Sequence, residues 1–218
     1  MKDKKVIIII AVIIVAIVLI AVFNNKGNEK NNITNNTGAT TTTQEDIQKQ
    51  EDKKGKDVKL GETIEDEYIK MTLDTFEVEA EYKFRYETKG SVGTSIKNSG
   101  IEGKSGMKLV CLRGKLTNKT SSDVYTSNNF VKGEMTINGN KYKTTLKCFD
   151  TEHAEHYTTM VAQQEAEYFL YAEVPENVAD NIESCNISFG WVKDLDSRNT
   201  AFATNISDLD YIYTLQAK

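Results

Sequence analysis

Two patterns of hydrophobic and polar residues divide this chain. Residues 6–23 form an uninterrupted apolar run, whereas residues 58–218 alternate apolar and polar positions over many short segments. Successive side chains of a β-strand point to opposite faces, so alternation with a period of two predicts strands that each bury one face. The first pattern predicts a membrane helix, and the second predicts a β domain.

The alternating positions fall into rows that we assign to strands. The turn residues Asn138-Gly139 predict a tight hairpin, because both tolerate positive φ, and Pro175 predicts a strand end followed by one helical turn. Many short strands with little helical periodicity predict an all-β domain of two packed antiparallel sheets, a β-sandwich. The apolar rows are Ala80, Tyr82, Phe84 and Tyr86; Val110, Leu112 and Leu116; Tyr168, Leu170, Ala172 and Val174; Cys185, Ile187, Phe189 and Trp191; and Tyr211, Tyr213 and Leu215.

The apolar run predicts a single transmembrane helix. Its 18 residues would reach roughly 27 Å as a helix, enough to cross the hydrocarbon of a bilayer. Lysines in the stub at residues 1–5 favour a cytoplasmic N-terminus, which places everything after the run outside the cytoplasm. An uncleaved signal anchor is favoured over a cleaved signal peptide, because Phe23 stands where a small residue is expected.

Residues 24–57 predict a disordered polar spacer between the membrane and the domain. They are rich in Asn, Thr, Lys, Gln and Glu and contain little that could be buried. The rest of the chain, residues 58–218, has the length of one domain. The sequence therefore predicts a cell-membrane protein with a tethered extracytoplasmic domain.

Three short motifs in this domain carry a family resemblance. They are KLGETI at residues 59–64, LVCLRGKLTNKTSSD at 109–123 and FLYAEVPENV at 169–178. Their order resembles the immunoglobulin-like, telokin-like domains of unknown function found on membrane proteins and lipoproteins of Gram-positive bacteria. The resemblance implies an immunoglobulin-like sandwich in a cell envelope and brings no catalytic residues. The chain departs from the family in its helical anchor and in a long Gly/Ser-rich insertion after Tyr86.

Charge and motifs argue against several classes of partner. The net charge is −5 and there is no basic stripe, so no nucleic-acid partner is expected. The segment at residues 98–105 ends in Gly-Lys-Ser but begins with Asn98, where a phosphate-binding loop requires Gly. We therefore expect no nucleotide and no other cofactor.

Two sets of residues are candidates for metal binding and for a disulfide. His153 and His156 would face the same side of a helical turn and could bind a transition metal, although a solvated loop is the simpler interpretation. Among three cysteines, Cys148 and Cys185 share faces with apolar residues and are the favoured disulfide pair, with buried free thiols as the alternative. Cys111 shares its face with Arg113.

The candidate ligand site is a long loop predicted at residues 88–106. The aromatic row Tyr82, Phe84 and Tyr86 leads into this loop, which also carries Lys104. Long loops in compact β domains are either functional or flexible, so these residues could contact a ligand, or the aromatics could belong to the core.

Three functions remain open from sequence. The first is a non-catalytic binding module of the cell envelope whose ligand is a protein, wall polymer or glycan. The second is a metal-assisted hydrolase that uses His153 and His156. The third is an accessory subunit of another membrane protein, for which the apolar run offers neither a Gly-x-x-x-Gly pattern nor a charge.

Overall fold

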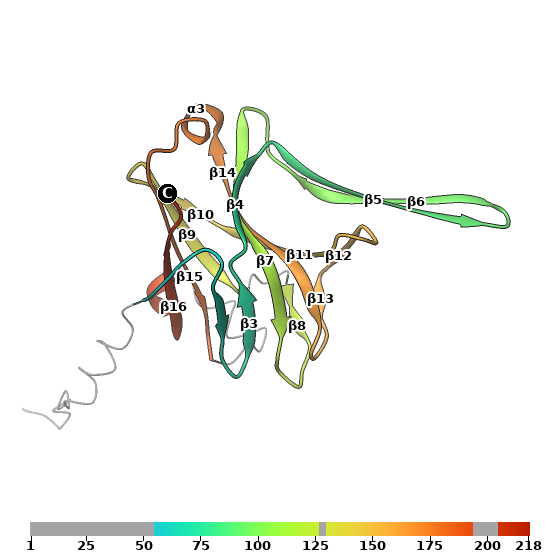
Figure 1. Cartoon of the computed structure of the whole chain (residues 1–218), viewed down its shortest axis with the longest axis horizontal. Helices are drawn as coiled ribbons and strands as arrows, with labels where there is room; N and C mark the ends of the chain where they lie inside the picture. The colour runs from blue at the N-terminus through green and yellow to red at the C-terminus, as the bar shows by residue number, and fades with distance from the viewer. Residues whose placement is uncertain (1–54, 127–129, 194–204) are drawn as a thin grey trace, which may run out of the picture. The chain divides into compact units, whose positions relative to one another are not determined.

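The structure is a computed structural model that describes residues 55–126, 130–193 and 205–218 (Figure 1). These ranges are nearly all-β, with one helical turn, α3 (Glu176–Ala179), after Pro175 as predicted, and one 3-10 turn, η2 (Ile206–Asp208). No helix within them is long and apolar enough to span a bilayer. The predicted anchor at residues 6–23, the stub at 1–5 and the spacer up to residue 54 lie outside the described residues.

Two larger sheets contain most of the strands. The five-stranded sheet is antiparallel except that strand β1 runs parallel to its neighbour β16. In order across the sheet, its strands are β1 (Lys56–Val58), β16 (Tyr211–Gln216), β15 (Cys185–Trp191), β9 (Lys132–Ile137) and β10 (Asn140–Lys143). The seven-stranded sheet is antiparallel, in the order β12 (Glu155–Tyr157), β11 (Thr145–Asp150), β14 (Glu165–Pro175), β7 (Met107–Asn118), β3 (Ile69–Thr72) and β2 (Thr63–Glu65), with β4 (Thr75–Glu79) also paired to β7.

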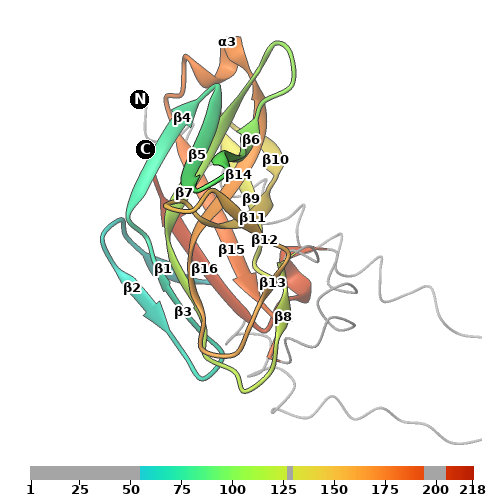
Figure 2. The same cartoon turned by 90° about the vertical axis from the view of Figure 1, so that its right-hand side faces the viewer.

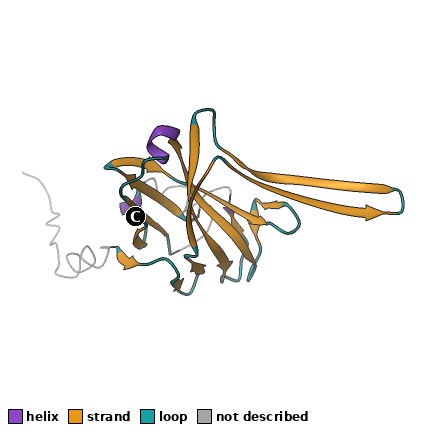
Figure 3. Cartoon of the chain, turned by 45° about the horizontal axis from the view of Figure 1, so that its top comes forward, coloured by secondary structure: helices purple, strands orange, loops and turns teal. Residues whose placement is uncertain are grey.

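Two strand pairs lie outside these sheets. A small pair joins β8 (Val124–Tyr125) to β13 (Thr159–Met160), and a long hairpin joins β5 (Glu81–Gly90) to β6 (Gly93–Glu102). The long hairpin extends away from the two sheets in Figures 1 and 3, and it points toward the viewer in Figure 2. We call residues 81–102 the arm.

The main core lies between the two larger sheets. Rows from both sheets form one cluster, in which Leu112 and Leu170 come from the seven-stranded sheet and Ile187 and Phe189 come from the five-stranded sheet. Burying each such side chain stabilises the fold by about 1.5–3 kcal/mol. The predicted strands at 110–116, 168–174, 185–191 and 211–215 are confirmed. The Asn138-Gly139 hairpin is also confirmed, with φ of 48° and 80°.

Two sequence predictions are wrong in detail. Lys56 and Asp57, placed in the spacer, belong to β1, which pairs with β16. Residues 93–102, placed in a loop, form β6, which pairs with β5 along its whole length. Because of the second error, the sequence prediction lacks the arm, which is the largest departure of this fold from two packed sheets.

Candidate functional site

The arm is inserted between two neighbouring strands. β4 pairs with β7, and the arm is the stretch of chain that connects them, beginning after β4 and ending just before β7. The backbone N–H of Gly103 donates to the carbonyl of Ala80 at 3.0 Å and closes the arm at its base. At the far end, Gly90 pairs with Gly93 around the two-residue turn Ser91-Val92.

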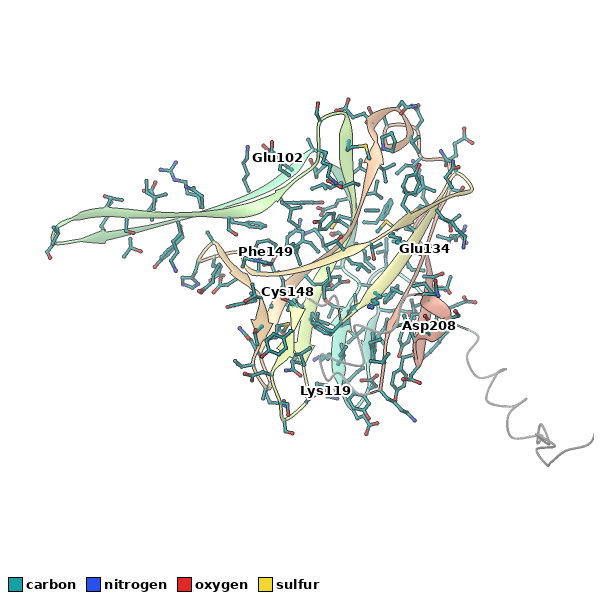
Figure 4. All side chains as sticks on the ribbon, turned by 180° about the vertical axis from the view of Figure 1, so that it is seen from behind. Glu102, Lys119, Glu134, Cys148, Phe149 and Asp208 are labelled. Atoms are coloured by element: carbon teal, nitrogen blue, oxygen red, sulfur yellow. The ribbon has the colours of Figure 1, made fainter. Side chains whose placement is uncertain are left out.

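The base of the arm covers the outer face of the seven-stranded sheet. Tyr82 and Ile101 from the arm pack with Leu109, Cys111 and Phe169 in a second buried cluster, which also contains Phe149 and is separate from the core between the sheets. The sequence predicted strands that each bury one face, so burial of this second face was not expected. We call the cluster the arm seat, and in Figure 4 its member Phe149 lies near the place where the arm leaves the sheets.

The arm seat is aromatic. The ring of Tyr82 lies 4.9 Å from that of Phe169, and the ring of Phe84 lies 5.1 Å from that of Phe149. Tilted ring pairs at these distances add about 0.5–1.5 kcal/mol each beyond the burial of their area. The predicted ligand residues Tyr82 and Phe84 therefore contribute mainly to packing, which is the alternative that the sequence left open.

Arg113 extends the arm seat toward solvent. Its guanidinium carbon lies 4.6 Å from the centre of the Phe169 ring and 5.2 Å from that of Tyr82. Its Nη1 is 2.9 Å from a carboxylate oxygen of Glu77. Burial alone would raise the pKa of Glu77, but hydrogen bonds led by the one from Arg113 lower that pKa below its ordinary value. The sequence prediction that Arg113 shares a face with Cys111 is confirmed by their common position under the arm.

Both histidines of the chain lie beside the arm seat. The ring of His153 meets the edge of Tyr86 at 5.0 Å, and its Nδ1 lies 2.7 Å from Asp150 Oδ2. The ring of His156, on β12, lies 5.0 Å from that of Phe149. Burial, and secondly the charge of Lys147, lower the pKa of His156.

This arrangement does not assemble a metal centre. His153 lies in a turn and His156 on a strand, so the helical turn considered from sequence is not formed. Within the described ranges no three His, Cys, Asp or Glu residues are grouped closely enough to hold a metal ion. The two histidines instead make aromatic contacts with the arm and its seat.

The remaining predicted ligand residues separate. Tyr86 stays on the arm beside His153, half-buried. Lys104 lies beyond the arm, in the turn before β7, and forms an ion pair with Glu173 of β14. Lys104 thus lies where the chain returns to the sheet and does not join the aromatic row.

A hollow of about 540 Å³ opens at the base of the arm. It is lined by residues 82–85 of β5 and residues 98–102 of β6. A Cβ atom at Gly100 would lie 2.0 Å from the carbonyl oxygen of Tyr82, so the two strands approach here as only glycine allows. The hollow lies in the part of the arm nearest the sheets. The distal part of the arm is exposed along both strands.

The three cysteines are free thiols, all of them buried. Cys148 on β11 and Cys185 on β15 belong to the core between the sheets, and the disulfide favoured from sequence is not formed between them. Cys111 belongs to the arm seat. Burial raises the pKa of all three thiols, that of Cys185 to about 11, so none is poised as a nucleophile.

Comparison with one solved structure supports the two-sheet fold. An uncharacterised β-sandwich protein from Clostridium difficile 630 aligns with a TM-score of 0.54 and 16% sequence identity, over 76% of this chain and 95% of that chain. A functionally unknown protein from Listeria monocytogenes EGD-e aligns with a TM-score of 0.39 and 13% identity, over 71% of this chain and 80% of that chain. No protein-family model and no curated protein matches this chain. The similarity to the Clostridium difficile 630 protein concerns the fold alone.

Proposed function

We propose that this chain is a non-catalytic interaction module of a bacterial cell envelope, tethered to the membrane by residues 6–23 and facing away from the cytoplasm. The apolar run and the basic stub before it support the anchor and its orientation. The three motifs in the β domain support membership of the immunoglobulin-like, telokin-like group of Gram-positive envelope proteins. The ligand is a protein or a wall polymer or glycan.

The arm is the element that we propose contacts this ligand. Ten residue pairs join β5 to β6, yet only the pairs near Tyr82 and Phe84 pack on the sheet. A two-stranded ribbon without further packing is marginally stable in water, and each ordered residue costs about 1–2 kcal/mol of backbone entropy. The distal part of the arm adds nothing to the core, and such a projection is best explained by contacts with another molecule. This is the observation that carries the proposal.

Shortening the arm tests this proposal. Hydrogen-bonded and open pairs alternate from the Gly90–Gly93 pair, so Tyr86 and Lys97 form a hydrogen-bonded pair of the kind that closes a two-residue turn. Replacing residues 87–96 with Asn-Gly between Tyr86 and Lys97 therefore keeps the register and leaves the arm seat intact. The full-length chain and this variant are produced in bacterial cells, crosslinked on the intact cells and recovered with their bound molecules. We expect the full-length chain to capture a specific envelope component that the shortened variant loses.

A second exposed hairpin provides the control. Lys141 and Lys143 lie on β10, which is not part of the arm. Replacing them with alanine removes two amines that a crosslinker could react with and leaves the arm unchanged. Capture should survive this change. Capture that is unaffected by shortening the arm would contradict the assignment of the ligand contact to the arm.

A further inference from the structure

The two edges of the arm differ in chemistry. On β5 the residues Lys83, Arg85, Glu87 and Lys89 alternate with the aromatic row, so this edge is charged. On β6 residues 94–99 carry one charge, Lys97, and the exposed side chain of Ile96. Natural proteins protect edge strands with charges, prolines or bulges because unpaired backbone groups attract other strands. The distal part of β6 has little of this protection.

The register shows which backbone groups of β6 face outward. Gly90 and Gly93 close a two-residue turn, and such a closing pair is hydrogen-bonded. Hydrogen-bonded and open pairs alternate along an antiparallel ladder, so Thr94, Ile96 and Asn98 direct their N–H and C=O groups away from β5. An added strand can bond to these three residues without any change within the arm.

The sequence of β6 is compatible with pairing to itself. In an antiparallel register centred on Ile96, the isoleucines of two copies oppose each other and Thr94 opposes Asn98. On the other face Ser95 opposes Lys97, so no like charges are directly opposite. The contact is self-complementary, as a two-fold symmetric interface requires, and it covers Ile96, which is 48% exposed.

Charge makes the edge of β5 a poorer fit for a second copy. An antiparallel self-pairing centred on Arg85 places two arginines opposite each other, although Lys83 then opposes Glu87 and Glu81 opposes Lys89. Moving the register by one pair in either direction places Lys83 opposite Lys89 or opposite Arg85. Each of these β5 registers places like charges directly opposite each other, which is destabilising, whereas the β6 register centred on Ile96 places none, so β6 is the edge that better fits a second copy.

We propose that the partner of the arm is a second copy of this chain, joined through antiparallel pairing of the two β6 strands into a four-stranded sheet centred on Ile96. This inference rests on the proposed function, because it names the molecule that the arm contacts. Confining both copies to one membrane raises their effective concentration, so that a short interface of this kind forms.

Cysteine crosslinking between two full-length chains tests the register. In the proposed sheet Ser95 and Lys97 of different copies form an open pair, with Cα atoms about 4.5 Å apart, within the range that a disulfide can bridge. Chains carrying Ser95→Cys and Lys97→Cys, each with its own tag, are produced together and oxidised in their membranes. We expect a mixed dimer that requires both cysteines, since the natural cysteines are buried.

The matched control moves one cysteine to the other edge of the arm. Thr88 pairs with Ser95 within one arm and is also exposed, but it lies on β5, so Thr88→Cys with Lys97→Cys should give at least ten-fold less mixed dimer. Equal crosslinking of the two combinations, or none with Ser95→Cys and Lys97→Cys, would overturn the proposal.

Ile96→Lys separates this inference from the proposed function. It places two positive charges on the symmetry axis without disturbing the arm seat, and should reduce the mixed dimer at least ten-fold, whereas Ile96→Val should retain it. If the Ser95/Lys97 crosslink is absent while cells still show an envelope component lost on shortening the arm, the second-copy inference fails and the proposed function stands. Crosslinking that persists in Ile96→Lys would also overturn the inference.

Discussion

The ring of Tyr82, at the base of the arm, lies 4.9 Å from the ring of Phe169 on β14 and shares the guanidinium of Arg113 with it. This contact holds the arm to the seven-stranded sheet, although Tyr82 and Phe169 are far apart in sequence. Tyr82→Ala should destabilise the domain by about 3 kcal/mol, because it removes a buried ring and leaves a cavity. Hydrogen exchange should accelerate most in the arm.

An exposed tyrosine provides the comparison for this prediction. Tyr125, on β8, is 50% exposed, so Tyr125→Ala should change the free energy of unfolding by less than about 0.5 kcal/mol. Denaturant unfolding of the full-length proteins in detergent measures both effects. Equal stabilities for the two variants would show that the arm seat does not hold the arm.

Gly100 sets the path of the arm at its base. A Cβ atom there would lie 2.0 Å from the carbonyl oxygen of Tyr82, which cannot move without breaking the packing of the tyrosine. Gly100→Ala should therefore destabilise the arm and weaken any interaction made through it. Gly90→Ala is the matched change on the same arm, since its nearest atom would be 3.7 Å away, and it should be tolerated. Protease cleavage between Lys83 and Lys97 measures arm opening, and equal cleavage in both variants would contradict the prediction.

The strands of the main core could be predicted from sequence because each buries one face locally. Rows such as Ile187 and Phe189 carry the alternation by themselves, and Asn138-Gly139 specifies its turn by positive φ. The arm could not, because residues 93–102 are mostly polar and form a strand only by pairing with β5. Local composition therefore suggested a loop.

The arm seat was missed for a related reason, although a signal for it existed. Residues 109–112 and 168–170 are apolar without interruption, a pattern typical of strands that are covered on both faces. The sequence does not show what covers the second face. That element, the arm, is adjacent to β7 in the chain and becomes visible only in the register of β5 with β6.

Asn118 holds the end of β7 through its buried amide. Its Nδ2 donates to the carbonyls of Ser122, Met160 and Val161 at 2.8, 3.1 and 3.2 Å, and its Oδ1 accepts from Thr120. Asn118→Asp replaces the donor with a charged acceptor and should cost about 3 kcal/mol of unfolding free energy.

The same burial makes the Asn-Lys-Thr triplet at this position inaccessible to glycosylation in the folded domain.

Asn181→Asp is the control for Asn118→Asp. The Nδ2 of Asn181 donates to the carbonyl of Asn177 at 2.8 Å in an exposed turn, where water can replace the lost bond, so the cost should stay below about 1 kcal/mol. Thermal unfolding of both variants compares them. A loss at Asn118 no larger than that at Asn181 would show that the buried amide has no special role.

The domain should lose stability in mild acid through His156. Burial and Lys147 lower the pKa of this histidine from the ordinary value of 6.5, so the unfolded chain binds the proton at a higher pH than the folded one. The contribution is complete above 6.5 and is lost as the pH falls below it. His156→Gln should flatten the dependence of the unfolding free energy on pH between about 7.5 and 5. A wild-type curve that is already flat there would contradict this.

The cysteines offer a chemical test of the interior. Cys111 lies in the arm seat, and Cys148 and Cys185 lie in the main core, all three with raised pKa values caused by burial. A maleimide at neutral pH should therefore label none of them in the native protein, because a protonated and inaccessible thiol does not react. Mass spectrometry after denaturation without reductant should then show three adducts, one for each cysteine of the chain. A single adduct under that condition would mean that two thiols are joined, which would contradict the finding that all three cysteines are free. Rapid labelling of Cys111 alone in the native protein would show instead that the arm opens from its seat, and Tyr82→Ala should increase that labelling.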